Sequence, residues 1–165
     1  MYVPPNEMTG SARVWIYSAD RFLTDDEVSS IREELLDFVQ KWTAHNHNLK
    51  ATVSIRFNRH IVLAVDEALA QASGCSIDSS VKFIQQLGAK YHFDGLDRLQ
   101  YTYLDHQEPK LISHHNIVKA FEGGAIQPNT LIANPLIKTW EEYTSKFIIP
   151  LKDSFLSRFL DLSKV

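Results

Sequence analysis

Cysteine is nearly absent from this sequence of 165 residues, in which Cys75 is the single thiol. One thiol excludes a disulfide framework, and without Cys-x-x-Cys the chain lacks the dithiol redox motif. Glycine is also scarce, and the sequence contains neither Gly-x-x-x-x-Gly-Lys-Ser/Thr, nor Gly-x-Gly-x-x-Gly, nor Gly-x-Ser-x-Gly. We therefore do not expect an ATPase, a dinucleotide-binding enzyme or a serine hydrolase that depends on these motifs.

Long hydrophobic runs and an excess of positive charge are lacking too. No apolar run approaches the roughly 18 residues of a membrane-spanning helix, and residues 1–10 show no basic start followed by an apolar segment. The 17 Lys and Arg residues are outnumbered by 20 Asp and Glu residues, which gives a net charge of −3. Because nucleic-acid binders usually present a basic surface, nucleic acid is not an expected partner. We expect a cytoplasmic protein without a membrane span.

The composition is that of a globular protein, with 44% hydrophobic and 22% charged residues. At about 150 residues per domain, the length predicts one domain with an appended element. We expect a flexible tail over residues 1–10, a core over residues 11–109, and a C-terminal extension over residues 110–165 that packs on the core.

The first half of the core shows clear strand and helix patterns. Arg13–Tyr17 is β-branched and aromatic, which predicts a strand covered on both faces. Residues 24–27 have the Thr-x-x-Glu spacing of a capping box, and apolar residues recur at helical intervals up to Trp42. Residues 51–57 alternate apolar and polar, whereas residues 61–65 are continuously apolar. These two runs predict a hairpin with an edge strand and a central strand, in which a two-residue loop places Phe57 opposite His60.

A second helix and a fourth strand complete the expected core. Ser76 or Asp78 can cap the helix that follows Gly74, and residues 98–104 alternate like an edge strand. The resulting order, βαββαβ, predicts an α+β fold with the antiparallel sheet of a ferredoxin-like split βαβ unit, in which the first and third strands are central. The alternative is another α+β sheet built from the same elements.

The C-terminal extension has its own α/β pattern. It predicts strands at residues 110–112 and 130–132, a Ser-capped helix that ends at Gly123, a helical segment over residues 140–147, and a last helix capped by Asp153. The sheet face that the two core helices leave open is one place where this segment can pack.

The loop at the start of the second helix is the first candidate site. A helix N-terminus stabilises a thiolate, which is the nucleophilic form of cysteine, so Cys75 is a candidate nucleophile. His45 or His60 is then the candidate base, with Asp66 or Asp78 in support. Alternatively, Cys75 is a small buried residue that fills the corner between strand and helix. In a third interpretation, the free amides of the helix start, with Ser76, Ser79 and Ser80, bind an anion or phosphate. The candidate ligand-binding residues are Gly74, Ser76, Ser79, Ser80, Arg56 and Trp15.

Two other groups of residues are weaker candidates. His45 and His47 form a His-x-His pair that metal sites use, but no further ligand follows from the spacing, so we expect no metal and no cofactor. Aromatic and arginine residues on the expected sheet resemble the surface on which single-stranded RNA stacks its bases. The acidic residues of the first helix, however, would repel the phosphate groups of RNA. The residues of that surface are Arg13, Trp15, Tyr17, Arg56, Arg59, Tyr101 and Tyr103.

Several segments resemble a family of short proteins from Bacteroidetes: Arg13–Tyr17, Trp42–His45, Leu63–Glu67, Ser73–Ser80 and the closing Pro150–Leu160. Members often carry the label "ABC transporter ATPase", which implies ATP binding, yet the phosphate loop that ATP binding needs is absent here. The resemblance implies a bacterial source and a cytoplasmic location. It does not assign an activity, because the family has no established one. Residues 112–139 also resemble GYF-like modules in Glu122–Ile126 and Pro128–Ile132, which implies interaction with a protein or peptide.

These observations favour a non-enzymatic module that binds a protein partner or a small ligand at the loop Gly74–Ser80. The first alternative is a thiol enzyme that depends on Cys75, and the second is anion binding at the same helix start. The sequence leaves the oligomeric state open.

Overall fold

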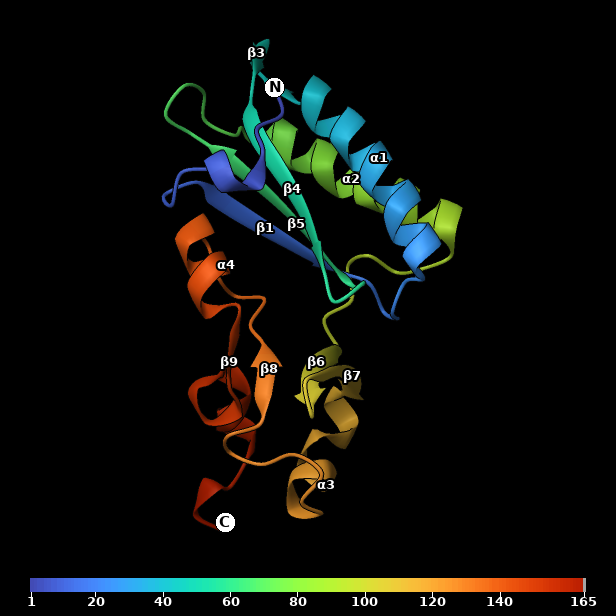
Figure 1. The fold of residues 1–165 in the computed structure, drawn as a ribbon, viewed down its shortest axis with the longest axis vertical. Helices are drawn as coiled ribbons and strands as arrows, with labels where there is room; N and C mark the ends of the chain where they lie inside the picture. Colours follow the sequence, from blue (N-terminus) through green and yellow to red (C-terminus); the bar gives the residue numbers. More distant parts are fainter. Residues whose placement is uncertain (165) are drawn as a thin grey trace. The chain divides into compact units, whose positions relative to one another are not determined.

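A computed structural model describes residues 1–164 and shows a mixed α+β fold with four α-helices and antiparallel sheets among those residues (Figure 1). The chain forms two compact units, one of residues 1–97 and 138–144 and the other of residues 98–137 and 145–165. The division follows Asp97 rather than residue 109, because the strand after it joins a different sheet. No helix within residues 1–164 is long and apolar enough to cross a membrane.

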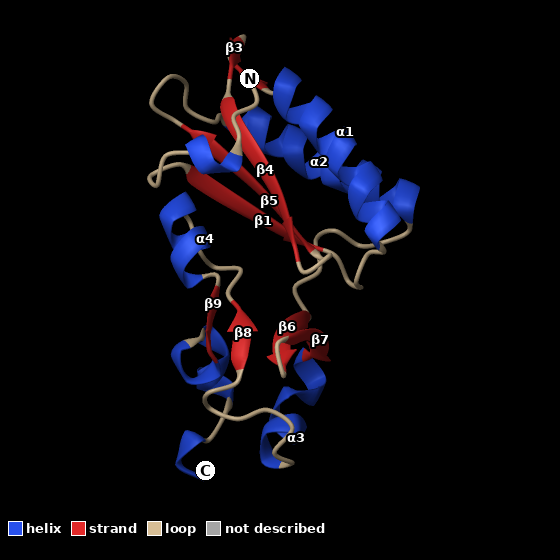
Figure 2. Cartoon of the chain, in the orientation of Figure 1, coloured by secondary structure: helices blue, strands red, loops and turns tan. Residues whose placement is uncertain are grey.

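Unit 1 contains a three-stranded sheet in the order β1-β5-β4, a short hairpin and two long helices. Figure 2 shows the helices beside each other along the sheet, and the rings of Phe38 and Phe83 stack between them with centroids 4.5 Å apart. The elements are β1 (Arg13–Ser18), α1 (Asp25–Lys41), β2 (Thr43–Ala44), β3 (His47–Asn48), β4 (Lys50–Arg56), β5 (His60–Asp66) and α2 (Gly74–Tyr91).

The central strand and the first helix follow the sequence pattern. All seven residues of β5 are buried, as the continuous apolar run predicts for a strand with neighbours on both sides. Helix α1 begins after Thr24, whose hydroxyl accepts a hydrogen bond from the Glu27 amide while the Glu27 carboxylate accepts one from the Thr24 amide. This reciprocal pair is the capping box that the sequence predicts.

The strand order matches only part of the expected ferredoxin-like unit. The order β1-β5-β4 is that of its first three strands, but the fourth predicted strand pairs in the other sheet, so β1 is an edge strand instead of a central one. The segment around Thr139 occupies part of that edge: the Val14 amide donates to the Lys138 carbonyl, and the Trp140 amide donates to the Ala12 carbonyl.

The β4–β5 hairpin differs from the prediction by one residue. Arg56 pairs with His60, so the loop has three residues and Phe57 is not part of the strand. Phe57 and Asn58 have left-handed backbones, with φ of 54° and 50°. Because phenylalanine rarely adopts this conformation, residue preferences do not predict the longer turn.

The first residues are attached to the sheet instead of forming the expected flexible tail. The Val3 amide donates to the Ala51 carbonyl over 2.8 Å, and the Ala51 amide donates to the Met1 carbonyl over 3.0 Å. Val3 and Met8 are buried. This segment includes the single-turn helix η1 (Pro5–Glu7). Backbone pairing with β4 and burial of apolar side chains hold it in place.

Unit 2 has a four-stranded sheet in the order β7-β6-β8-β9 and its own apolar core. The predicted C-terminal helix consists of short 3₁₀ turns, and Ser154 instead of Asp153 caps η4 through its hydroxyl. The elements are β6 (Gln100–Asp105), β7 (Glu108–Ser113), η2 (His114–Asn116), α3 (Ile117–Glu122), β8 (Leu131–Ala133), β9 (Ile148–Pro150), η3 (Leu151–Asp153), η4 (Phe155–Phe159) and η5 (Leu162–Lys164). Helix α4 (Trp140–Lys146) begins in the part of unit 1 that residues 138–144 form and ends in unit 2.

A buried arginine fixes the point where the chain leaves unit 1. Arg59 is 1% exposed, donates from Nε to the Ala19 carbonyl over 2.6 Å, and forms an ion pair with Asp97 at 2.9 Å. Replacing one partner of a buried pair leaves the other charge without compensation.

We therefore expect Arg59→Met to lower the free energy of unfolding of unit 1 by about 3 kcal/mol. Urea denaturation followed by tryptophan fluorescence measures this unit, because all three tryptophans lie in it. The matched control is Arg32→Met, which removes an exposed arginine from α1 and is expected to change stability by less than about 0.5 kcal/mol. Equal stability of the two variants contradicts the role of Arg59.

Candidate functional site

Helix α2 begins one turn earlier than the sequence predicts. Its N-cap is Ser73, whose hydroxyl accepts a hydrogen bond from the Ser76 amide over 3.2 Å, so neither Ser76 nor Asp78 caps it. Gly74 is the first helical residue and Cys75 the second, and both are exposed, so the expectation of a buried Cys75 that fills the corner is wrong. The amides of these two residues have no intrahelical carbonyl to bind, and the positive end of the helix dipole lies there.

The other three serines of this segment are used within the fold. The hydroxyls of Ser76, Ser79 and Ser80 donate to the carbonyls of Ser73, Ser76 and Ile77, each three residues earlier in the chain, over 2.7–2.8 Å. Ser80 is 1% exposed and its hydroxyl also lies 2.7 Å from the Tyr17 hydroxyl. In the structure these three hydroxyls therefore donate within the fold, and Ser80 is buried, so a ligand would have to replace these bonds to use them.

The β2–β3 hairpin brings two histidines to the start of α2. Ala44 pairs with His47, and the two loop residues between them, His45 and Asn46, have positive φ of 50° and 65°. This is the backbone of a tight two-residue hairpin turn. Such a turn leaves both histidine side chains exposed.

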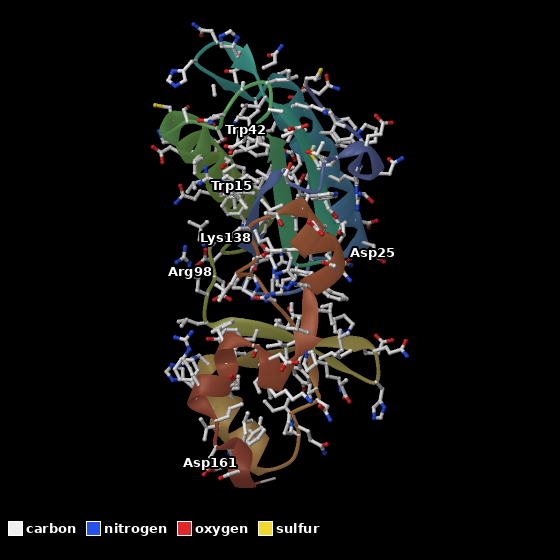
Figure 3. The ribbon with its side chains drawn as sticks, turned by 90° about the vertical axis from the view of Figure 1, so that its left-hand side faces the viewer. Trp15, Asp25, Trp42, Arg98, Lys138 and Asp161 are labelled. Carbon is white, nitrogen blue, oxygen red and sulfur yellow. The ribbon has the colours of Figure 1, made fainter. Side chains whose placement is uncertain are left out.

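Trp42 attaches this hairpin to the helix. Its indole nitrogen donates to the Ser76 carbonyl over 2.9 Å, and its ring lies 6.1 Å from that of Trp15 in an edge-on arrangement. Figure 3 shows both tryptophans close together beside α2. The indole bond therefore holds the hairpin against the first turns of α2.

A pocket of about 290 Å³ lies between the hairpin and the loop that precedes α2. In the sequence, His45 and the start of α2 are separate candidates. In the fold, His45 and Ser73 line the same pocket. Leu69, Gln71 and Ser73 were not predicted as site residues, although the spacing Ser73-x-x-Ser76 is compatible with a helix cap. The lining residues are Ala44, His45, His47, Leu69, Ala70, Gln71, Ala72 and Ser73.

No general base contacts the only thiol. Within residues 1–164 the Cys75 sulfur has no hydrogen-bond partner, and Asp78 is exposed on the same helix. A cysteine nucleophile is normally activated by a base within hydrogen-bond distance. The pocket is lined by two imidazoles, and the exposed thiol follows its last lining residue, Ser73, by two positions without forming a bonded Cys–His pair.

His60 lies far from this site. It begins β5, whereas α2 follows the other end of that strand, roughly 20 Å away at 3.3 Å per residue. Its Nδ1 lies 2.8 Å from the Ser18 hydroxyl. Burial, with smaller contributions from Arg59 and Arg56, lowers the pKa of His60 to about 3, so it is a poor base at neutral pH.

Asp66 is engaged in structural contacts. Its carboxylate accepts a hydrogen bond from Lys50 Nζ over 2.9 Å and another from the Ala68 amide. The bond from Lys50 is the main reason that the pKa of Asp66 lies below its usual value. These bonds connect β4, β5 and the loop that leads toward α2, so Asp66 supports the loop and does not assist Cys75.

Trp15 and Arg56 do not join the candidate site as a pair. The pairings Trp15–Leu63 and Arg56–His60 place them on opposite faces of the sheet. Trp15 and Tyr17 pack in the core with the helices, and Arg56 lies 5.9 Å from the Tyr143 ring on the other face. The stacking surface that the sequence suggested for RNA is thus divided between two faces, and Tyr101 and Tyr103 belong to unit 2.

Within residues 1–164, no three His, Cys, Asp or Glu side chains are placed to hold a metal ion.

Comparison with known proteins found no matching family model, no matching curated protein and no matching solved structure. The geometry of the site is therefore the basis for assigning a function.

The buried neutral His60 predicts acid destabilisation. The pKa of His60 is 6.5 in the unfolded chain and about 3 in the native state, so between these pH values only the unfolded chain is protonated at this residue. The free energy of unfolding should therefore fall as the pH decreases through this window, by at most about 5 kcal/mol. In His60→Asn, whose amide can still bond Ser18, the decrease should be smaller. The control His106→Asn replaces an exposed imidazole and should behave like the parent protein in urea denaturation between pH 7 and 4.

Proposed function

We propose that the chain is a cytoplasmic, non-enzymatic binding module whose ligand site is the pocket between the β2–β3 hairpin and the start of α2. The observation that carries this proposal is the convergence of His45, His47 and the helix start on one pocket of about 290 Å³. A volume of this size suits a small ligand or the end of a larger one.

Binding is favoured over catalysis by the contacts of the candidate reactive groups. Within the described residues the thiol has no bonded base, and His60 is buried elsewhere with a pKa lowered to about 3. The absence of a phosphate loop also argues against the ATPase label of the family that the sequence resembles. A bacterial source remains part of the proposal on the basis of that resemblance alone.

An anionic group fits this pocket best. Neutral imidazoles donate one hydrogen bond each and protonated ones donate two, so His45 and His47 can both donate to an anion in the pocket. The pocket also contains Ser73, which caps the helix, and the amide side chain of Gln71. The favoured ligand is thus a small molecule that carries a phosphate or a carboxylate.

Inorganic phosphate is a direct probe of this site. At pH 6 and ten times its dissociation constant, phosphate should stabilise the protein by about 1.4 kcal/mol and shift the NMR signals of His45 and His47. The double variant His45→Ala/His47→Ala should lose both effects. The matched control is His106→Ala, which removes an exposed histidine outside the pocket. If phosphate, acetate and citrate leave the signals of His45 and His47 unchanged, the pocket is not an anion site.

The alternative function is a thiol-dependent enzyme. One observation favours it: Cys75 is exposed in the first turn of α2, two residues after Ser73, which lines the pocket. In this alternative Cys75 is the nucleophile, His45 is the base and Asp78 supports the site. A ligand or substrate would have to bring the thiol and the imidazole into contact.

The pH dependence of Cys75 alkylation by iodoacetamide separates the two functions. For a binding module we expect the rate to rise with pH as for an ordinary exposed thiol, with the urea-unfolded chain as the reference. A rate that reaches its plateau below pH 7 in the native protein, and that falls in His45→Ala, would favour the enzyme. His106→Ala is again the matched control.

A further inference from the structure

Unit 2 carries an exposed aromatic surface that is separate from the pocket in unit 1. The His114 imidazole contacts the rings of Tyr101 and Phe159, whose centroids lie 6.0 and 5.2 Å from its own. The backbone amide of His114 donates a hydrogen bond to the Leu99 carbonyl over 2.8 Å. We call this set the His114 surface, and its residues are Leu99, Tyr101, His114, His115, Phe155, Arg158 and Phe159.

The surface combines solvent exposure with rigid support. The side chains of Leu99 and Phe159 are 58% and 45% exposed. Tyr101 and Phe155 contact each other edge-on at 5.8 Å and pack against the buried core of unit 2. Exposed apolar side chains on a supported aromatic base are typical of interaction sites.

A positively charged side chain, Arg158, lies beside these rings. The Arg158 guanidinium lies 5.8 Å from the centre of the Phe159 ring, and its Nε donates to the Phe155 carbonyl over 2.9 Å. Among residues 1–164 no carboxylate forms an ion pair with it. Unit 2 has 7 Lys and Arg residues against 5 Asp and Glu residues, although the whole chain has a net charge of −3. Arg158 therefore gives this surface a cation that complements a carboxylate of a partner.

His114 supplies a polar group within the surface. Its Nδ1 lies 2.9 Å from the Tyr101 hydroxyl, and its Nε2 has no partner among residues 1–164. When the phenol donates to Nδ1, the neutral ring carries its hydrogen on Nε2. That nitrogen can then donate to a carboxylate, and the protonated ring has the same donor.

We propose that the His114 surface binds a segment of a partner protein in which a carboxylate lies next to a large apolar side chain. The apolar side chain contacts Leu99 and Phe159, while the carboxylate binds Arg158 and His114 Nε2. Aromatic and arginine side chains are the residues that contribute most to protein interfaces. This surface belongs to unit 2, so the proposal does not depend on the ligand of the pocket in unit 1.

Selection from a random 12-residue phage-displayed peptide library tests this proposal while the partner is still unidentified. The full chain as bait should enrich peptides in which Asp or Glu neighbours Leu, Phe, Met or Trp. The bait variants Phe159→Ser and Arg158→Glu should lose this enrichment. The matched control is Leu131→Ser, which replaces another exposed leucine of unit 2 outside the surface and should retain it.

The charge requirement is tested with the most enriched peptide. Its Asp→Asn or Glu→Gln version should bind at least tenfold more weakly in a fluorescence-anisotropy titration. The proposal is overturned if no motif is enriched, if the motif lacks an acid, or if Phe159→Ser selects the same peptides. A concentration-dependent dimer in sedimentation velocity that Phe159→Ser abolishes would assign the surface to a second copy of the chain, and would also overturn it.

Discussion

The fully buried strand β5 is the constraint on which unit 1 depends. Because it pairs with β1 on one side and β4 on the other, its backbone groups are satisfied without water, and its side chains bury apolar surface on both faces. The two ends of this strand then have different roles. Arg59 and His60 at one end fix the hairpin and the exit of the chain toward unit 2. Asp66 at the other end, bound to Lys50, starts the loop that leads to α2 and the pocket.

A long-range hydrogen bond connects the two segments that form the candidate site. The bond from the Trp42 indole to the Ser76 carbonyl joins segments 34 residues apart. It positions a hairpin, whose turn needs positive φ at His45 and Asn46, against the first turns of a helix. The outcome is a pocket whose lining includes two histidines and the N-cap residue of α2.

The two units also divide the charge of the chain. Unit 1 carries all of the net negative charge, including the acids of the first turn of α1, whereas unit 2 carries a small positive excess, and its Arg158 lies beside the Phe159 ring. A protein with two chemically different surfaces can bind two different kinds of molecule. The ligand that we propose for the pocket in unit 1 is a small anion, and the one that we propose for the His114 surface is a longer segment that contacts it through side chains.

Local physical chemistry determined the elements that the sequence predicts correctly. The capping box at Thr24 needs only neighbours within a few residues, and the strand character of β5 follows from its own continuous apolar run; both are present as expected. Tertiary contacts decided the rest. The fourth predicted strand pairs in another sheet because strand pattern does not specify a partner, and Phe57 adopts a left-handed turn that propensity disfavours. The proximity of His45 to the start of α2 was likewise invisible in the sequence, since the indole bond that creates it joins residues distant along the chain.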